Sequence, residues 1–243
     1  YQRGEVAEAE GRYTEALAMA EELDATTLII NLRNNLGVLA NIRGDIDGAI
    51  GHYEHCVTLA EAAGNEPLLA QAYHNLGMAH ADKQDWAGAN EKYEQALELA
   101  RKKGIGQLIG TTYLNKAELY LALSDVSQAA ATCGKALSVF KASGDKLSEA
   151  EAYRVLGDVF ARRGSSSSAI KMLDQSLEMT KLANAPLEIA EAYRAKGLVC
   201  ERLGQADTAV EAFREAIAHF EKCDATQDKA ATEQDLARVT GAA

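Results

Sequence analysis

The chain has 243 residues, a formal net charge of −11 and a pI near 5.0. This acidic balance argues against nucleic-acid partners, whose phosphates require basic patches, and against anionic membrane surfaces. No apolar run approaches the roughly 18 residues of a membrane helix, and no signal peptide is visible. Only two prolines, 6% aromatic residues and no alternating β-branched runs favour an all-α chain.

Small residues recur every 40 residues along the sequence. One series is invariably alanine, at Ala9, Ala49, Ala89, Ala129, Ala169 and Ala209. A second series is glycine with one alanine, at Gly37, Gly77, Ala117, Gly157 and Gly197. A fixed period of this size predicts stacked copies of one supersecondary unit, in which each copy buries its faces against its neighbours.

Further columns show what each copy contains. Four residues before the glycine column stand Tyr73, Tyr113, Tyr153 and Tyr193, and directly before it stand Leu36, Leu76 and Leu156, with Lys116 and Lys196 as departures. Four residues after the alanine column stand Tyr13, Tyr53, Tyr93, Cys133, Leu173 and Phe213. Apolar positions three and four apart mark one face of an amphipathic helix. Each copy is therefore a helical hairpin: helix A carries the Tyr–Leu–Gly columns, and helix B carries the alanine and second aromatic columns.

In chain order, a half repeat (1–25) holds a helix B over about 5–23. Full repeats follow over about 26–65, 66–105, 106–145, 146–185 and 186–225, and a capping segment (226–240) holds a final helix A. Helix A is expected to end at Gly44, Gly164 and Gly204, and helix B at Gly64, Gly104, Gly144 and Asn184, where a left-handed residue is needed. Pro67 and Pro186 are expected in the first turn of the helix that follows.

The first helix B has no helix A before it, so the chain reads as a fragment of a longer protein. This arrangement leaves Tyr13 and Leu17 with an uncovered apolar flank. Stacked repeats need polar terminal caps for solubility, so self-association through the N-terminal half repeat is expected.

The order aromatic, Leu-Gly, Ala, aromatic, Ala at fixed offsets resembles the tetratricopeptide repeat, from Gly4 to about Val239. The unit of 40 residues, against about 34 in most of the family, is similar to that of Partner of Inscuteable, kinesin light chain and bacterial regulators. The tryptophan often found at the first aromatic column is tyrosine here, and the closing proline is absent. The resemblance implies a right-handed α-solenoid of antiparallel helical hairpins, with helix A lining the concave surface.

Catalytic and metal-binding candidates are few. His52, His55 and Cys56 have metal-like spacing, but Cys56 falls in a packing column and no fourth ligand is nearby in sequence. The glycines at 104, 106 and 110 imitate a phosphate loop but lie between two helices, so a turn is the better interpretation. The serines 165–168 follow Arg162-Arg163, and they suit either a kinase site or a helix N-cap. The sequence therefore predicts no enzyme, no cofactor and no metal.

The four cysteines are scattered, without a C-x-x-C pair: Cys56, Cys133, Cys200 and Cys223. Cys56 and Cys133 occupy packing columns, so we expect small buried thiols rather than disulfides. This usage fits a reducing compartment and predicts a cytoplasmic protein.

Two positions before the glycine column, helix A carries asparagine in three successive repeats: Asn35, Asn75 and Asn115. Asparagine is a mediocre helix former, so its repetition in register needs a reason. An amide can bind the N–H and C=O of an extended peptide at once, and the related kinesin light chain repeats imply such a ladder. The alternative is that these amides bond to neighbouring repeats or to each other. If they bind peptide, at least two of the three should be accessible and without a protein hydrogen bond.

In the fourth and fifth repeats this column changes to Val155 and Ala195, and neighbouring columns become charged. Paired arginines one helix apart could hold a carboxylate of a partner. Equally, Glu151, Arg154, Asp158 and Arg162 lie three and four apart, as in an intrahelical ladder of ion pairs.

The sequence thus predicts a non-catalytic scaffold that binds a protein or an extended peptide in its concave groove. The alternative is a sensor module of a larger bacterial signalling or transcription protein. The expected groove residues are Asn34, Asn35, His74, Asn75, Met78, Asn115, Glu118, Arg154, Asp158 and Arg194.

Overall fold

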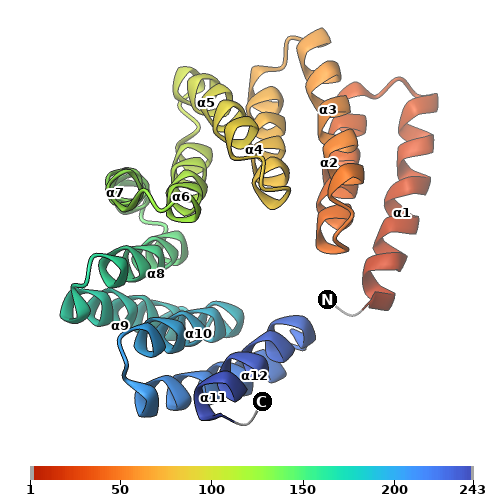
Figure 1. Cartoon of the computed structure of the whole chain (residues 1–243). Coiled ribbons are helices and arrows are strands. Elements are labelled where there is room, and N and C mark those ends of the chain that lie inside the picture. The colour runs from red at the N-terminus through yellow and green to blue at the C-terminus, as the bar shows by residue number, and fades with distance from the viewer. Residues whose placement is uncertain (1–2, 242–243) are drawn as a thin grey trace. The chain divides into compact units, whose positions relative to one another are not determined.

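The computed structural model describes residues 3–241, which form twelve α-helices and no strand (Figure 1). Helix A of successive repeats is α2 (Thr26–Ile42), α4 (Glu66–Asp82), α6 (Gly106–Ala122), α8 (Lys146–Arg162), α10 (Pro186–Arg202) and α12 (Thr226–Thr240). Helix B is α1 (Arg3–Glu22), α3 (Ile46–Ala62), α5 (Trp86–Lys103), α7 (Val126–Ser143), α9 (Ser166–Leu182) and α11 (Ala206–Lys222). The all-helical hairpin architecture is therefore confirmed.

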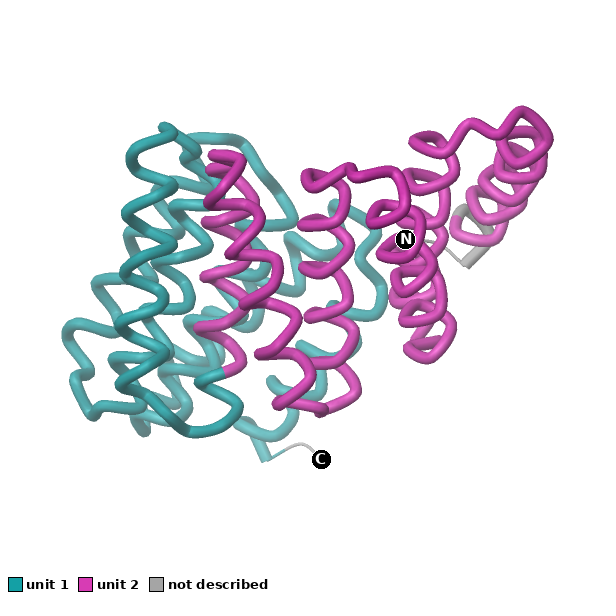
Figure 2. Tube along the Cα trace, turned by 90° about the horizontal axis from the view of Figure 1, so that it is seen from above, with its two compact units in different colours: residues 1, 120–243 teal, residues 2–119 magenta. Residues whose placement is uncertain are grey.

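Two compact units divide the chain, as Figure 2 shows: residues 2–119 (unit 2) and residues 120–243 (unit 1), with the boundary inside α6. Within each unit, helices pack against their neighbours in sequence, and the buried residues form a series of small clusters. This is the nearest-neighbour packing expected of stacked repeats. In the described range, no helix combines the length and the apolar character needed to cross a membrane.

The turns between helices share one geometry with a spacing of 20 residues. A left-handed residue with φ between 52° and 80° occurs at Asp24, Gly44, Gly64, Gln84, Gly104, Ser124, Gly144, Gly164, Asn184, Gly204 and Asp224. All seven positions expected at helix ends have this conformation. The other four positions are Asp24, Gln84, Ser124 and Asp224, which the sequence did not predict to be left-handed. Pro67 and Pro186 lie in the first turns of α4 and α10, as expected.

A side-chain cap is made by each aspartate or asparagine at an N-cap position, whereas Gln205 before α11 makes none. The side chains of Asp45, Asn65, Asp85, Asp125 and Asp145 each accept a hydrogen bond from the backbone N–H three residues later. Each such bond satisfies one of the free N–H groups of the first turn. Ser165 occupies the N-cap position of α9, but its hydroxyl makes no capping bond, so the expected serine cap is wrong in this respect.

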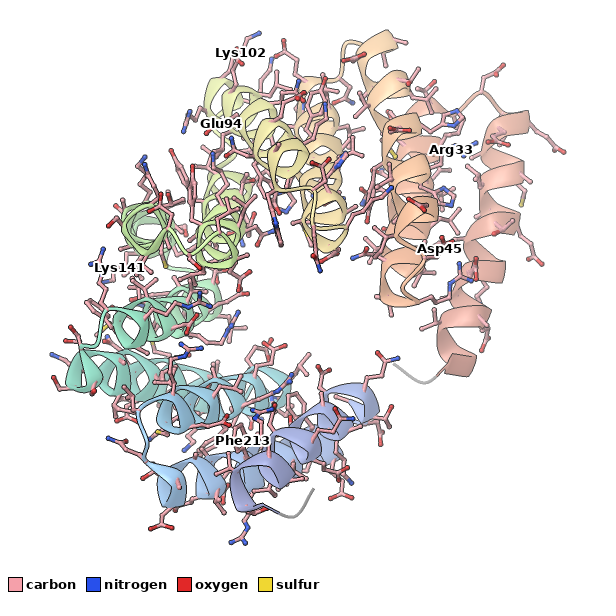
Figure 3. The ribbon with its side chains drawn as sticks, in the orientation of Figure 1. Arg33, Asp45, Glu94, Lys102, Lys141 and Phe213 are labelled. Carbon is pink, nitrogen blue, oxygen red and sulfur yellow. The ribbon has the colours of Figure 1, made fainter. Side chains whose placement is uncertain are left out.

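The glycine column is a place where helix A meets the aromatic column of helix B. A Cβ atom at Gly37, Gly77 or Gly197 would lie 2.5 Å from the ring of Tyr53, Tyr93 or Phe213, respectively. At Gly157 the opposing residue is Leu173, at 2.6 Å. Only glycine permits this approach, which explains the 40-residue recurrence. Phe213, labelled in Figure 3, is fully buried on α11.

The alanine column is buried without exposure at Ala49, Ala89, Ala129, Ala169 and Ala209. Ala9 is half-buried, because α1 packs only against α2 among the described helices. On the same helix Leu17 is buried against Leu32 and Leu36. The expectation that Leu17 carries an uncovered apolar flank is therefore wrong, since α2 covers it.

The two lysines in the leucine column have a common explanation. Lys116 is 3% exposed and forms an ion pair with Glu94 on α5, which Figure 3 labels. Lys196 pairs with Asp174 at 2.6 Å. In both repeats the acid lies 22 residues before the lysine. The departures from leucine are thus accompanied by an acid on the preceding helix B.

The tyrosine column lies at the contact between one hairpin and the next. Each tyrosine meets a residue 12 positions earlier, at the end of the preceding helix B: Tyr73 with Glu61, Tyr113 with Arg101, Tyr153 with Lys141 and Tyr193 with Lys181. The cations lie 4.7 to 5.4 Å from the ring centroids, within the range of cation–π attraction. In the first repeat the column holds Arg33, and its partner at the same offset is Glu21. Figure 3 labels Arg33 and Lys141.

Candidate interaction surface

The asparagine column does not form an open ladder. Asn75 is 7% exposed, its Oδ1 accepts a hydrogen bond from Gln71 at 3.1 Å, and its amide donates to Oδ1 of Asn34 on α2. Asn115 bonds to the hydroxyl of Tyr93. Asn35 is half-buried and bonds to no described side chain. The expectation that at least two of the three amides lack protein hydrogen bonds is therefore wrong.

The cause is the spacing of neighbouring A helices in the stack. Asn34 and Asn75 lie 41 residues apart, one repeat plus one residue, and this offset places their amides within bonding reach. The same offset recurs between Asn41 and Asp82, which are joined at 2.8 Å. Some amides that were expected to bind a peptide therefore bind the neighbouring repeat instead.

His74 is also a packing residue rather than a surface one. It is 6% exposed, and its Nδ1 lies 2.8 Å from the hydroxyl of Thr112 on α6. Because that hydroxyl donates to the Leu108 carbonyl at 2.6 Å, Nδ1 carries the proton and donates to Thr112. Burial lowers the pKa of His74 to about 4, so the ring is neutral at physiological pH. The expected groove position of His74 is corrected accordingly.

Met78 and Glu118 lie where a ligand can reach them. Met78 is 38% exposed, and both residues line a hollow of about 280 Å³ in unit 2. The hollow is lined by Met78, Ala81, Asp82, Trp86, Tyr93, Asn115, Glu118 and Leu119. Sequence reasoning missed Asp82 and Trp86. Trp86 is the single tryptophan of the chain and begins α5, and this was a usable signal.

In unit 1 the charged residues form ion pairs both within and between helices. Asp158 accepts from Arg162 on its own helix at 2.9 Å and also pairs with Arg202 on α10. Arg194 bonds to Asp235 on α12 at 3.0 Å, and Arg154 lies 3.6 Å from Glu151. The intrahelical ladder is therefore present, and bonds from helix to helix add to it.

Two hollows in unit 1 share Glu151, Arg154 and Glu191. One, of about 250 Å³, adds Leu147, Ser148, Ser176, Thr180, Leu187 and Glu188; the other, of about 370 Å³, adds Arg194, Ala195, Leu198, Phe220 and Asp228. Burial raises the pKa of Glu191, and the nearby carboxylates add to that rise while Arg154 opposes it. Opposite charges are thus already close together in these hollows.

The remaining sequence candidates lie apart from these surfaces. Cys56 is buried and donates to the Ile30 carbonyl at 3.3 Å, and all four cysteines are free thiols. Across the described residues, no group of three histidine, cysteine or acidic side chains is arranged to hold a metal ion. Gly104 caps α5 in the left-handed conformation, and α6 begins at Gly106, so this segment is a turn between two helices.

Comparison with known families gives the assignment. One tetratricopeptide repeat family model matches residues 28–102 and 108–181, and a second tetratricopeptide repeat model matches residues 167–226. Together these matches span most of the sequence.

The chain belongs to the tetratricopeptide repeat family. A search of curated protein sequences finds no significant match.

Solved structures with the same fold are distant in sequence. BtubC (BKLC) from P. vanneervenii is 18% identical with a TM-score of 0.73, over 90% of this chain and 92% of that one. The apo form of RapI is 12% identical with a TM-score of 0.70, over 98% and 93% of the two chains. A signal-transduction ATPase with a tetratricopeptide repeat sensor, from Pyrococcus horikoshii, is 15% identical with a TM-score of 0.72, over 93% of this chain but only 34% of that one. These likenesses concern the fold.

Proposed function

We propose that this tetratricopeptide repeat chain is a non-catalytic interaction module that binds an extended peptide or partner segment along its A helices. The observation that carries the proposal is the hollow in unit 2, where Met78 and Trp86 leave apolar surface that hairpin packing does not fill. Val38 and Ile42 on α2 are 41% and 38% exposed and extend the apolar surface of the A helices. Apolar side chains that remain exposed beside a hollow are typical of binding sites.

The revised groove differs from the one expected from sequence. In unit 2 the proposed groove keeps Met78, Asn115 and Glu118 at the hollow and Asn35 on α2, and it gains Trp86. His74 and Asn75 are left out because both are buried. In unit 1 it retains Arg154, Asp158 and Arg194, whose ion pairs a partner would have to exchange or extend. Affinity for a neutral or apolar peptide is therefore expected to come chiefly from unit 2.

A second candidate is a sensor module of a larger signalling or transcription protein. It is favoured by the likeness to a signal-transduction ATPase whose repeats are named as its sensor. A catalytic or DNA-binding domain in the same gene product would support this alternative. The two candidates share one surface, because a sensor must also bind its effector.

We extend the proposal to the compartment and to self-association. Four free thiols, three of them buried, fit a cytoplasmic protein, since an oxidising compartment favours disulfides.

Met19 and Leu23 are 65% and 76% exposed at the end of α1, and they are candidates for a contact between two copies. Light scattering of the Leu23→Glu variant tests that contact, and a mass equal to that of the unchanged chain at every concentration argues against it.

Selection from a random linear peptide library displayed on phage tests the groove. The chain should enrich binders, and Met78→Ala should weaken them about tenfold, because Met78 borders the hollow. Leu182→Ala is the matched control, since Leu182 is an exposed apolar residue at the end of α9, outside the hollow. Equal loss in both variants, or no enriched peptide, contradicts the proposal. Thermal melts of both variants verify that each is folded.

A further inference from the structure

We infer that the smaller hollow of unit 1 receives a phenylalanine side chain of the bound partner. This inference rests on the proposed function and adds one apolar contact to it, beside the ion-paired groove residues of unit 1. The hollow lies where α9 packs against α8 and α10, which also contact each other (Figure 1). Its volume of about 250 Å³ is below the roughly 300–1,000 Å³ of pockets for drug-sized ligands, so it suits a single side chain.

The joints between one hairpin and the next in unit 2 are filled by leucines. Helix B ends there in the small residues Ala60 and Ala100, and eight residues later, in the first turn of helix A, stand Leu68 and Leu108. Leu68 packs against the buried cluster of Ala60, and Leu108 belongs to the cluster of Ala100. At each of these two joints, one large apolar side chain therefore complements one small residue.

In unit 1 the same two columns exchange their sizes. Phe140 and Phe220 occupy the helix B column and are fully buried, and the residues eight positions later are the small or polar Ser148 and Asp228. A ring on helix B thus supplies the volume that a leucine on helix A supplies in unit 2.

The joint between α9 and α10 has neither the leucine nor the ring. Thr180 and Glu188 hold the two positions, and both residues line the hollow. Threonine is much smaller than phenylalanine, and a carboxylate needs water or a polar partner, so neither side chain fills an apolar joint. Because protein interiors are close-packed, volume that is missing at one joint leaves room for another group. The joints of Phe140 and Phe220 show which group fits there.

Leu147 and Leu187 give the hollow exposed apolar walls. They hold the same position at the starts of α8 and α10, are 39% and 40% exposed, and both line the hollow. Thr180 is only 2% exposed, so an incoming ring meets chiefly the two leucines. Glu188 and Glu191 also line the hollow. Since the edge of an aromatic ring is electrically positive, these carboxylates favour a ring over an aliphatic chain.

Titration of the intact chain with N-acetylphenylalaninamide, followed by the leucine methyl signals in NMR spectra, tests this site. We expect the signals of Leu147 and Leu187 to shift, with a dissociation constant on the order of 1 mM. The signals of Leu123, which is 48% exposed directly after α6 and outside the hollow, should not shift. N-acetylleucinamide and N-acetyllysinamide should bind about threefold more weakly.

Two variants show whether the ring enters this hollow. Thr180→Phe places a ring there from within, as Phe140 and Phe220 do in their joints, so the shifts should disappear. Leu187→Ala removes one wall and should weaken binding about fivefold. Leu123→Ala is the matched control and should leave binding unchanged. Thermal melts verify that each variant is folded, and if Thr180→Phe is not, Leu187→Ala decides.

The outcomes separate this inference from the proposed function. The phenylalanine site is overturned if Leu147 and Leu187 do not shift, if the leucine or lysine derivative binds equally well, or if folded Thr180→Phe or Leu187→Ala binds as before. A peptide bound at the hollow in unit 2 is unaffected by these results. A peptide library without binders overturns the proposed function and with it the claim that a partner supplies the ring.

Discussion

Polar residues of the A helices in this chain are used for contacts between repeats as well as for exposed surface. Asn75 has two side-chain partners, Gln71 and Asn34, whereas Asn35 two positions before Gly37 has none among the described residues. A buried amide that loses its partners is costly, and an amide without partners in a helix contributes little. The asparagine column therefore contains a buried amide that joins two repeats and a half-buried amide that has no side-chain partner among the described residues.

Alanine substitutions in this column should separate the two roles. Asn75→Ala is expected to lower the free energy of unfolding by about 1–3 kcal/mol, because Asn34 and Gln71 lose a buried partner. Asn35→Ala should leave stability unchanged or raise it by a few tenths of a kcal/mol, since alanine is the better helix former. Urea unfolding curves of the two variants measure both effects. Equal curves would show that Asn75 is open to solvent after all.

His74 makes stability depend on pH. Its pKa is about 4 in the folded chain, against the ordinary 6.5, so between these values the unfolded chain binds more protons. The contribution is complete above the unfolded pKa and is lost as the pH falls towards the folded one. Between pH 7.5 and pH 5 we expect the free energy of unfolding to fall by about 2 kcal/mol from this group.

Urea unfolding at both pH values, with His74→Gln for comparison, measures this contribution. The variant should lose about 2 kcal/mol less than the unchanged chain on acidification. His55→Gln, on the exposed face of α3, should retain the full pH dependence. The same loss in the His74→Gln chain as in the unchanged chain would place the pH dependence elsewhere.

At the scale of the helix, a 20-residue half-period determines the hairpin. Most helices span 17 or 18 residues and end at a left-handed residue, so each helix returns beside its predecessor in the same register. Alanine at the closest contact and glycine opposite an aromatic ring then recur at fixed positions. Packing at this density tolerates extra volume poorly.

Enlarging one member of the alanine column should therefore depend on its surroundings. Ala89→Leu is expected to cost about 1–3 kcal/mol of unfolding free energy, because Ala89 has no exposed surface and its neighbours cannot move apart freely. Ala9→Leu, in the same column but half-buried, should cost clearly less. Ala87→Leu, exposed on the same helix as Ala89, controls for helix propensity. Thermal melts that rank the three variants equally would contradict this placement of the column.

At the scale of the whole chain, the helix contacts within each unit join neighbours or next neighbours in sequence. Stability in such a stack is approximately a sum of repeat and interface contributions. A local lesion should therefore weaken the adjacent helices first and leave distant ones protected.

Hydrogen exchange of Phe213→Ala tests this local character. The substitution removes a fully buried ring that lies against Gly197, so exchange should quicken in α10, α11 and α12. Protection of α2, α3 and α4 should be unchanged. Arg214→Ala, exposed on the same helix, should alter neither region. A uniform rise in exchange over the whole chain would instead indicate one cooperative core.

The sequence by itself determined the repeat, the hairpin, the packing columns and seven of the left-handed turns, because these features depend on local periodicity and on glycine and asparagine at fixed intervals. Only the tertiary structure decided which polar side chains are buried and bonded between helices. Asn34 with Asn75, Lys116 with Glu94 and His74 with Thr112 are pairs across helices. Their geometry depends on the distance and rotation between neighbouring helices, which a periodic pattern leaves open. For the same reason the sequence did not predict the hollow lined by Asp82, Trp86 and Glu118, because these residues come from three different helices, α4, α5 and α6.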